Sequence, residues 1–113
     1  MSRDYKVYLD DILGAVYKIK KYTKGMSESK FYKDDKTIDA VVRNLAIIGE
    51  AVKKLPSEIR IKHNEIDWKK IAGMRDLLVH EYFEIDSEII WDIIKSKLDG
   101  LEESVGKILK TRK

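Results

Sequence analysis

The sequence predicts an all-α fold, an up-and-down bundle of four to five helices that forms a homodimer. Apolar residues recur at helical spacing along the whole chain, and no stretch alternates apolar and polar residues as a strand would. The single proline stands at position 56, and the segments between the periodic stretches are short. The 113 residues are expected to form one domain over residues 1–113.

The first half of the chain begins with a long helix and a short one. Asp4 has the side chain of an N-cap, and the helix after it is expected to run to about Tyr22, before the stop signal of Gly25. Ser27 then caps one helical turn, ESKFYK, whose Phe31 is expected to pack against the bundle. The apolar stripe of the long helix consists of Tyr5, Tyr8, Leu9, Ile12, Val16 and Ile19.

The second long helix starts at Asp34 or Asp35 and ends before Pro56, because the residue before a proline is disfavoured in the helical region. Its small residues Ala46 and Gly49 would let a neighbouring helix approach closely. A second copy of the chain is the favoured explanation of its wide apolar face, and a central helix surrounded within one chain is the alternative. That face comprises Val41, Val42, Leu45, Ala46, Ile47, Ile48, Ala51 and Val52.

The second half predicts three more helices. Ser57 caps a short one, EIRIKH, and Asp67 caps a longer one that leads to His80. After a tight connection, FEID, Asp86 caps the last helix, in which Gly100 is the expected position of a bend or interruption. The expected core residues of the longer helix are Trp68, Ile71, Met74, Leu77, Leu78 and Val79. Those of the last helix are Ile89, Ile90, Trp91, Ile93, Ile94, Leu98, Leu101, Val105, Ile108 and Leu109.

The composition excludes several classes of protein. Cysteine is absent, so there is neither a disulfide framework nor a thiol nucleophile. No apolar run approaches the roughly 18 residues of a membrane span. The N-terminal MSRDYKVYLD lacks the apolar stretch of a signal peptide, so the expected location is the cytoplasm. The net charge of +3, from 23 basic and 20 acidic residues, permits a nucleic-acid partner without demanding one.

One stretch, RDLLVHEY at residues 75–82, concentrates polar and reactive side chains. Asp76 and His80 are four residues apart, so they share a helical face within reach of a carboxylate–imidazole contact. Arg75 and Tyr82 fall near one line along the helix. Arg75 and His80, by contrast, are separated by about 140° around the axis. Either the helix ends or bends near His80, or a second copy of the chain supplies the other half of a site.

These residue types suit cleavage of RNA without a metal ion. Histidine is the commonest general acid or base, and arginine offers a fixed positive fork to phosphate. Two copies each of Arg75 and His80, one from each subunit, would supply the base, the acid and the cation that attack by a 2′-hydroxyl requires. The spacing also fits a purely structural role, with His80 capping helix carbonyls and Arg75 in a surface ion pair. His63 is interpreted as a solvated residue, and neither a metal site nor another cofactor is predicted.

Several segments of the chain resemble one known family. Its R-x4-H-x-Y motif matches RDLLVHEY, and its second-helix signature resembles RNLAIIGEAVKKLP at residues 43–56. Its most characteristic block resembles IDWKKIAGMRDLLVHEYF at residues 66–83, and the opening RDYKVYLDDIL is also similar. On these matches, which cover nearly the whole chain, the sequence resembles the HepT-like proteins, a branch of the HEPN domain superfamily.

The resemblance implies a helical dimer whose interface cleft is lined by the motif. It implies a metal-independent endoribonuclease, acting on tRNA or mRNA, that is the toxin of a type VII (HepT/MntA-like) toxin–antitoxin module. Position by position, Arg75 and His80 correspond to the catalytic pair and Asp76 to a supporting residue. The partner would be a small MntA-like nucleotidyltransferase antitoxin that transfers AMP to Tyr82. The alternative is a non-catalytic HEPN subunit that binds a nucleotide or scaffolds that nucleotidyltransferase.

Glu50 is conspicuous as an acid on an otherwise apolar helix. One interpretation pairs it with Arg75 or Arg43 across a dimer interface, where both residues would support the site. The other makes it a partly exposed member of an ordinary ion pair, and the sequence leaves both open.

Overall fold

The computed structural model describes residues 4–80 and 86–111, with the side chains of residues 79, 80 and 111 excepted. Over these residues the chain is helical and contains no strand, which confirms the all-α prediction. Two of the helices have only 5 and 6 residues, so five remain to form the bundle. None of the described helices combines the length and apolar character that crossing a membrane requires. The helices are α1 (Tyr5–Thr23), α2 (Glu28–Tyr32), α3 (Asp35–Lys54), α4 (Ser57–Lys62), α5 (Trp68–His80), α6 (Ser87–Ser96) and α7 (Leu98–Thr111).

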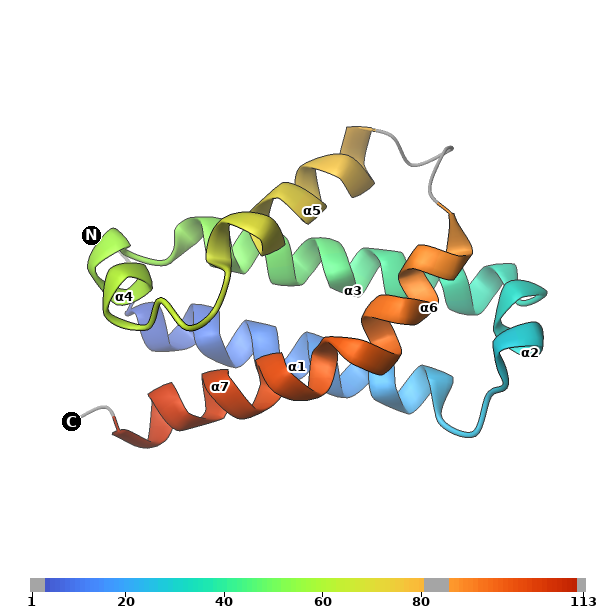
Figure 1. Ribbon diagram of the computed structural model, residues 1–113, viewed down its shortest axis with the longest axis horizontal. Helices are drawn as coiled ribbons and strands as arrows, with labels where there is room; N and C mark the ends of the chain where they lie inside the picture. Colours follow the sequence, from blue (N-terminus) through green and yellow to red (C-terminus); the bar gives the residue numbers. More distant parts are fainter. Residues whose placement is uncertain (1–3, 81–85, 112–113) are drawn as a thin grey trace.

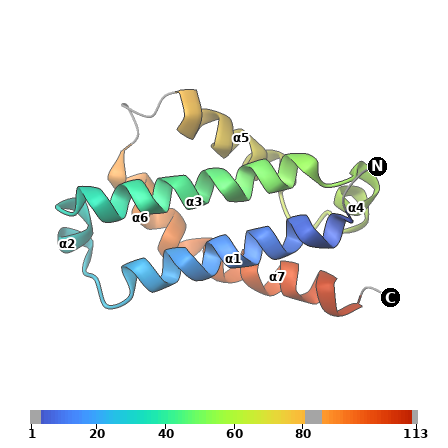
Figure 2. The same ribbon diagram turned by 180° about the vertical axis from the view of Figure 1, so that it is seen from behind.

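The long helices run alternately up and down the molecule (Figure 1). α1 and α3 lie side by side and antiparallel, joined by α2 at one end, and Figure 2 shows the same pair from behind. α4 lies at the opposite end, and α5 returns from it across α3. α6 then crosses the bundle and α7 runs back along α1 (Figure 1). α3 is therefore central, with α1 on one side and α5 on another.

The core lies largely between α1 and α3. The spacing of three and four residues between its members is the stripe that the periodicity predicts. Burying one aliphatic side chain of this size stabilises the fold by about 1.5–3 kcal/mol, so this face holds the two helices together. The fully buried residues on it are Leu9, Ile12, Val16 and Ile19 from α1, and Val41, Leu45, Ile48 and Val52 from α3.

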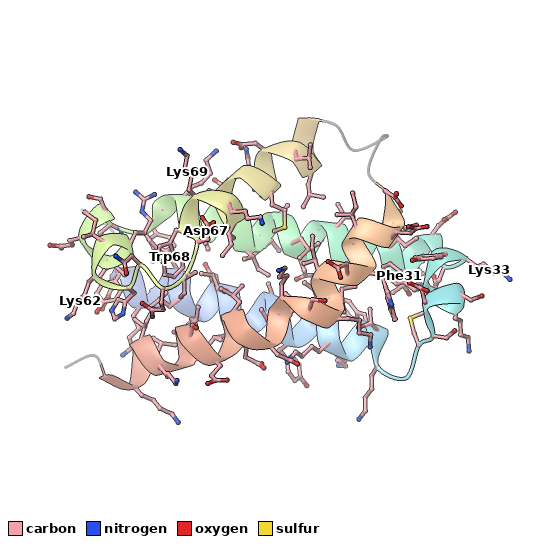
Figure 3. All side chains as sticks on the ribbon, viewed as in Figure 1. Phe31, Lys33, Lys62, Asp67, Trp68 and Lys69 are labelled. Carbon is pink, nitrogen blue, oxygen red and sulfur yellow. The ribbon has the colours of Figure 1, made fainter. Side chains whose placement is uncertain are left out.

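Side-chain caps fix most of the helix starts at the predicted positions. The capping residues, each accepting a hydrogen bond from a backbone N–H of the following helix, are Asp4, Ser27, Asp34, Asp67 and Asp86. Gly25, with a φ of 76°, takes the left-handed conformation just after α1. Phe31 of α2 is fully buried, as predicted, and its ring centroid lies 5.1 Å from that of Trp91 (Figure 3).

Two predicted details of the second half are wrong. Ser57 is the first residue of α4, not its cap, and no side chain caps that helix. The last helix breaks at Lys97 rather than at Gly100, which lies inside α7. Ile94 and Leu98, on either side of the break, are both buried. The change of direction between α6 and α7 therefore keeps the apolar residues of both helices against the core.

Two residues expected in the core lie at the surface of the single chain. Leu77 is 48% exposed and Ile89 is 57% exposed, whereas Leu78 is buried as predicted. α5 packs mainly on α3, so only one side of it is covered. Of the predicted connection FEID, residues 83–85 lie outside the described part of the chain.

The wide apolar face of α3 is covered within one chain. α1 packs on one side of it and α5 on another, so the structure matches the alternative of a surrounded central helix. A second copy is not needed to explain the width of this face. Dimerisation stays a prediction, and its support is the motif on α5 rather than the composition of α3.

Candidate active site

α3 and α5 meet at Gly49, and this meeting sets the position of Arg75. A Cβ atom built on Gly49 would lie 2.2 Å from the Cβ of Arg75 and 3.1 Å from its Cα. The first distance is far inside van der Waals contact, so a side chain on residue 49 would force the two helices apart. The small residue does admit a neighbouring helix, as predicted, but that helix belongs to the same chain.

Two carboxylates hold the guanidinium of Arg75. Its Nε lies 2.9 Å from Oε2 of Glu50, and its Nη1 donates a hydrogen bond to Oδ1 of Asp76 at 3.1 Å. The Arg75 side chain is 28% exposed, and no described residue accepts a hydrogen bond from Nη2. The guanidinium is therefore held at Nε and Nη1, and Nη2 has no acceptor among the described residues, which suits the binding of a phosphate oxygen. Glu50 is thus a partly exposed member of an ion pair within one chain, which was the second interpretation, and a pairing across a dimer interface stays a prediction.

Lys53 extends this network along α3. Its Nζ donates to Oδ1 of Asp76 at 2.8 Å, the same atom that Arg75 contacts. Lys54 adds a looser contact, with its Nζ 4.0 Å from Oε1 of Glu50. Among the described residues, three cations thus surround two carboxylates, and this excess of positive charge favours an anionic ligand.

Hydrogen bonds from Lys53 and then from Arg75 lower the pKa of the Asp76 carboxyl below its ordinary value. Asp76 therefore carries its charge throughout the neutral range. Because the pKa is lowered in the folded protein, the contact adds stability above the ordinary carboxyl pKa of about 4 and loses it as the pH falls through the folded value. The network that fixes Arg75 is accordingly intact at physiological pH.

The two other residues of the motif are less fully described. α5 is helical through His80, so position 80 lies about 140° around the axis from position 75. The side chain of His80 and the whole of Tyr82 lie outside the described part of the chain. The predicted contact between Asp76 and His80 is therefore untested, whereas the contacts of Asp76 with Arg75 and Lys53 are observed.

The remaining candidates lie away from this network. Arg43 is exposed and forms no ion pair with a described residue of the same chain. Its pairing with Glu50 across a dimer interface stays a prediction. His63, predicted to be solvated, follows α4 and is partly exposed, and its carbonyl accepts a 3.0 Å hydrogen bond from Nε1 of Trp68. Among the described residues, no group of three or more His, Cys, Asp or Glu side chains could hold a metal ion.

Sequence reasoning missed Lys53 and the contact partner of Gly49. A signal for the first existed, because Lys53 follows Glu50 by three residues and therefore shares its helical face. No sequence pattern pairs Gly49 with Arg75, which is 26 positions further along the chain.

Comparison with known proteins agrees with the motif. The family model described as "Ribonuclease HepT-like" matches residues 12–108. A protein of Thermococcus cleftensis named "Probable ribonuclease HepT" is 41% identical over 113 residues, which is the full length of both chains. A protein of Caldanaerobacter subterraneus subsp. tengcongensis named "Putative RNase" is 47% identical over 106 residues, covering 94% of this chain and 95% of its own.

A further relative is longer than this chain. It is a Methanocaldococcus jannaschii protein named "Gamma-glutamylcyclotransferase and putative RNase", 42% identical over 109 residues. The match covers 96% of this chain but 49% of that protein, so the chain spans about half the length of this relative. No solved structure matches the chain.

Proposed function

Because the chain belongs to the ribonuclease HepT-like family, we propose that it is an endoribonuclease that cleaves RNA by attack of the 2′-hydroxyl on the adjacent phosphate. The observation that carries the proposal is the fixed guanidinium of Arg75, whose Nη2 has no acceptor among the described residues and which lies in a described network with more cations than carboxylates. His80, five positions later at the end of the same helix, is the acid or base.

The reaction uses two proton transfers. One His80 takes the proton of the 2′-hydroxyl, and the 2′-oxygen forms a bond to phosphorus while the bond from phosphorus to the 5′-oxygen breaks. A second His80 gives a proton to the departing 5′-oxygen. The products are a 2′,3′-cyclic phosphate and a 5′-hydroxyl, and Arg75 stabilises the charge that builds on the phosphoryl oxygens.

Two protomers supply these groups. Positions 75 and 80 are about 140° apart on one regular helix, so a single α5 cannot direct both toward one phosphate. Two copies of α5 facing each other across a twofold axis could place both residue types in one cleft. The exposed Leu77, between the two positions, is an apolar residue that such an interface would cover.

The proposal predicts that the purified protein cleaves RNA in the presence of EDTA. The reaction as written contains no metal-dependent step, so chelation is expected to leave the rate within about twofold of the rate with Mg²⁺. The measurement is gel analysis of labelled tRNA and mRNA fragments, with mass spectrometry of the product ends. The matched control is the same RNA with 2′-O-methyl groups, which lacks the nucleophile and should stay intact. Failure to cleave any RNA class would remove the proposed activity.

In the same proposal the enzyme is the toxin of a toxin–antitoxin pair. The partner is a small nucleotidyltransferase, and the hydroxyl of Tyr82 attacks the α-phosphorus of ATP, releasing pyrophosphate and losing its own proton. The support is the R-x4-H-x-Y spacing of Arg75, His80 and Tyr82. An AMP group adds a bulky anion close in sequence to Arg75, which would neutralise the cation and obstruct the substrate phosphate.

Tyr82→Phe is expected to keep RNA cleavage but to escape this modification, because only the phenolic oxygen is lost. The measurement is intact mass after incubation with ATP and a cognate nucleotidyltransferase. Wild-type protein should gain the mass of one or more AMP groups and lose activity, whereas the variant should do neither. AMP mapped to another residue of the variant would contradict the assignment of Tyr82 as acceptor.

A further inference from the structure

α4 and the start of α5 enclose a hollow of about 600 Å³ beside the end of α3. Residues from all three helices line it: Lys53 from α3, Arg60 and Ile61 from α4, and Lys69 and Ala72 from α5. In Figure 3, Trp68 and Lys69 are labelled in this region, at the start of α5. The hollow is open to solvent, so a ligand can reach it without a change of fold.

The charged residues of the hollow are all cations. Lys53, Arg60 and Lys69 line it, and none of its described lining residues is acidic. Arg60 and Lys69 form no ion pair with a described residue, and the Nε of Arg60 is buried there without a hydrogen-bond partner. Asp67, close in sequence, caps α5 through the backbone N–H of Lys70. Lys53 is paired with Asp76, so it is Arg60 and Lys69, which have no ion-pair partner among the described residues, that favour an anionic ligand.

Lys53 connects the hollow to Arg75. It lines the hollow and also donates to Oδ1 of Asp76, the atom that accepts from Nη1 of Arg75. Ala72, another lining residue, precedes Arg75 by three positions, which is about 4.5 Å along α5 on the same side of the helix. A strand with one phosphate at Arg75 can therefore reach the mouth of the hollow with a neighbouring nucleotide.

Apart from the polar residues Ser57 and Asn64, the remaining wall is apolar. Ile61 is 72% exposed, and Ala72 and the methylene stems of the cations complete the surface. Trp68 is 5% exposed and its Nε1 donates to the carbonyl of His63, so it forms part of the wall and is not a stacking platform. Apolar walls under a cationic rim match a nucleotide, whose ribose or base is apolar on its faces and whose phosphate is anionic.

We propose that this hollow is a subsite for the nucleotide adjoining the scissile phosphate of single-stranded RNA. The phosphate of that nucleotide contacts Lys69 and Arg60, and its ribose or base packs on Ile61. The subsite rests on the proposed function, because it takes the RNA strand as the substrate at Arg75. The subsite adds contacts with RNA outside the reacting phosphate and so raises the affinity for RNA. It takes no part in the chemical step.

The test is a matched pair of charge-neutralising variants, Lys69→Gln and Lys33→Gln. Both lysines are exposed, and Figure 3 shows Lys33 at the far end of the molecule from Lys69. The probe is a fluorescent, fully 2′-O-methylated oligonucleotide, which binds but cannot be cleaved. Lys69→Gln should weaken binding about tenfold and reduce the slope of log Kd against log salt by about 0.7, the value for one phosphate contact on a single strand. Lys33→Gln should match the wild type in both.

Catalysis gives a second readout. Lys69→Gln should raise KM for a cleavable RNA and leave kcat within about twofold, since the residue does not touch the reacting atoms. Equal affinities of Lys69→Gln and Lys33→Gln would overturn the subsite while leaving the nuclease intact. Wild-type binding of the oligonucleotide that depends on Lys69, but without cleavage of any RNA, would instead retain the subsite and remove the nuclease. An inability of the wild type to bind the oligonucleotide overturns the subsite.

Discussion

Replacing His80 with alanine is expected to lower the rate of RNA cleavage by about 10²–10⁴-fold, the usual contribution of a general acid or base. Arg75→Ala should cause a comparable loss, because it removes the cation that stabilises charge on the phosphoryl oxygens. Arg75→Lys should recover little, since lysine keeps the charge but lacks the planar fork that contacts Glu50 and Asp76 in the structure. The measurement is single-turnover cleavage of a labelled RNA.

Circular dichroism and thermal melting provide the control for folding in these variants. His80 is the last residue of α5 and Arg75 is partly exposed, so both substitutions should leave the helical content unchanged. If folded His80→Ala protein still cleaves RNA, the proposed mechanism is contradicted, whether or not Arg75→Ala is active.

A mixed-dimer experiment separates a shared cleft from two independent sites. Whether the site is shared or each protomer has its own, a homodimer of Arg75→Ala protomers or of His80→Ala protomers is expected to be inactive. If one cleft is built from two protomers, their mixed dimer contains one Arg75 and one His80, which serve the cation and one of the two proton transfers, and it should regain part of the wild-type cleavage, above that of either homodimer. If each protomer has its own site, every protomer of the mixture lacks one group and the mixture stays inactive. A monomeric protein in sedimentation analysis would contradict the shared cleft directly.

Gly49→Ala is expected to destabilise the fold and to reduce cleavage together. Alanine is favoured over glycine in a helix by about 1 kcal/mol, but overpacking opposes it by about 1–3 kcal/mol. The added Cβ would lie 2.2 Å from the Cβ of Arg75 and 3.1 Å from its Cα, so the backbone of α5 must move. The clash is expected to dominate, and displacing Arg75 by about 1 Å could lower the cleavage rate by up to about 10²-fold.

Gly73→Ala is the matched control. Like Gly49, Gly73 lies inside a helix, in this case α5, but a Cβ there meets nothing within 4 Å. It should stabilise the protein by about 0.5–1 kcal/mol and leave cleavage near the wild-type rate. The free energy of unfolding comes from urea denaturation of the two variants and the wild type. If Gly49→Ala proves as stable and as active as Gly73→Ala, the close meeting of α3 and α5 does not set the position of Arg75.

The sequence by itself determined the secondary structure and pointed to the motif. The caps Asp4, Ser27 and Asp86 and the apolar stripes of α1 and α3 act within one or two helical turns, so they are visible in a short window of sequence. The R-x4-H-x-Y pattern is equally local. For the caps and the stripes the prediction and the structure agree, apart from the start of α4 and the break at Lys97.

The tertiary structure alone decided which residue faces which. It paired Glu50 with Arg75 rather than Arg43, added Lys53 to the site, and left Leu77 exposed. The reason is that a stripe or a cap fixes only the direction of a side chain from its own helix axis. Which neighbour it meets depends on how closely two helices approach, and here that distance is set by a glycine and an arginine on different helices.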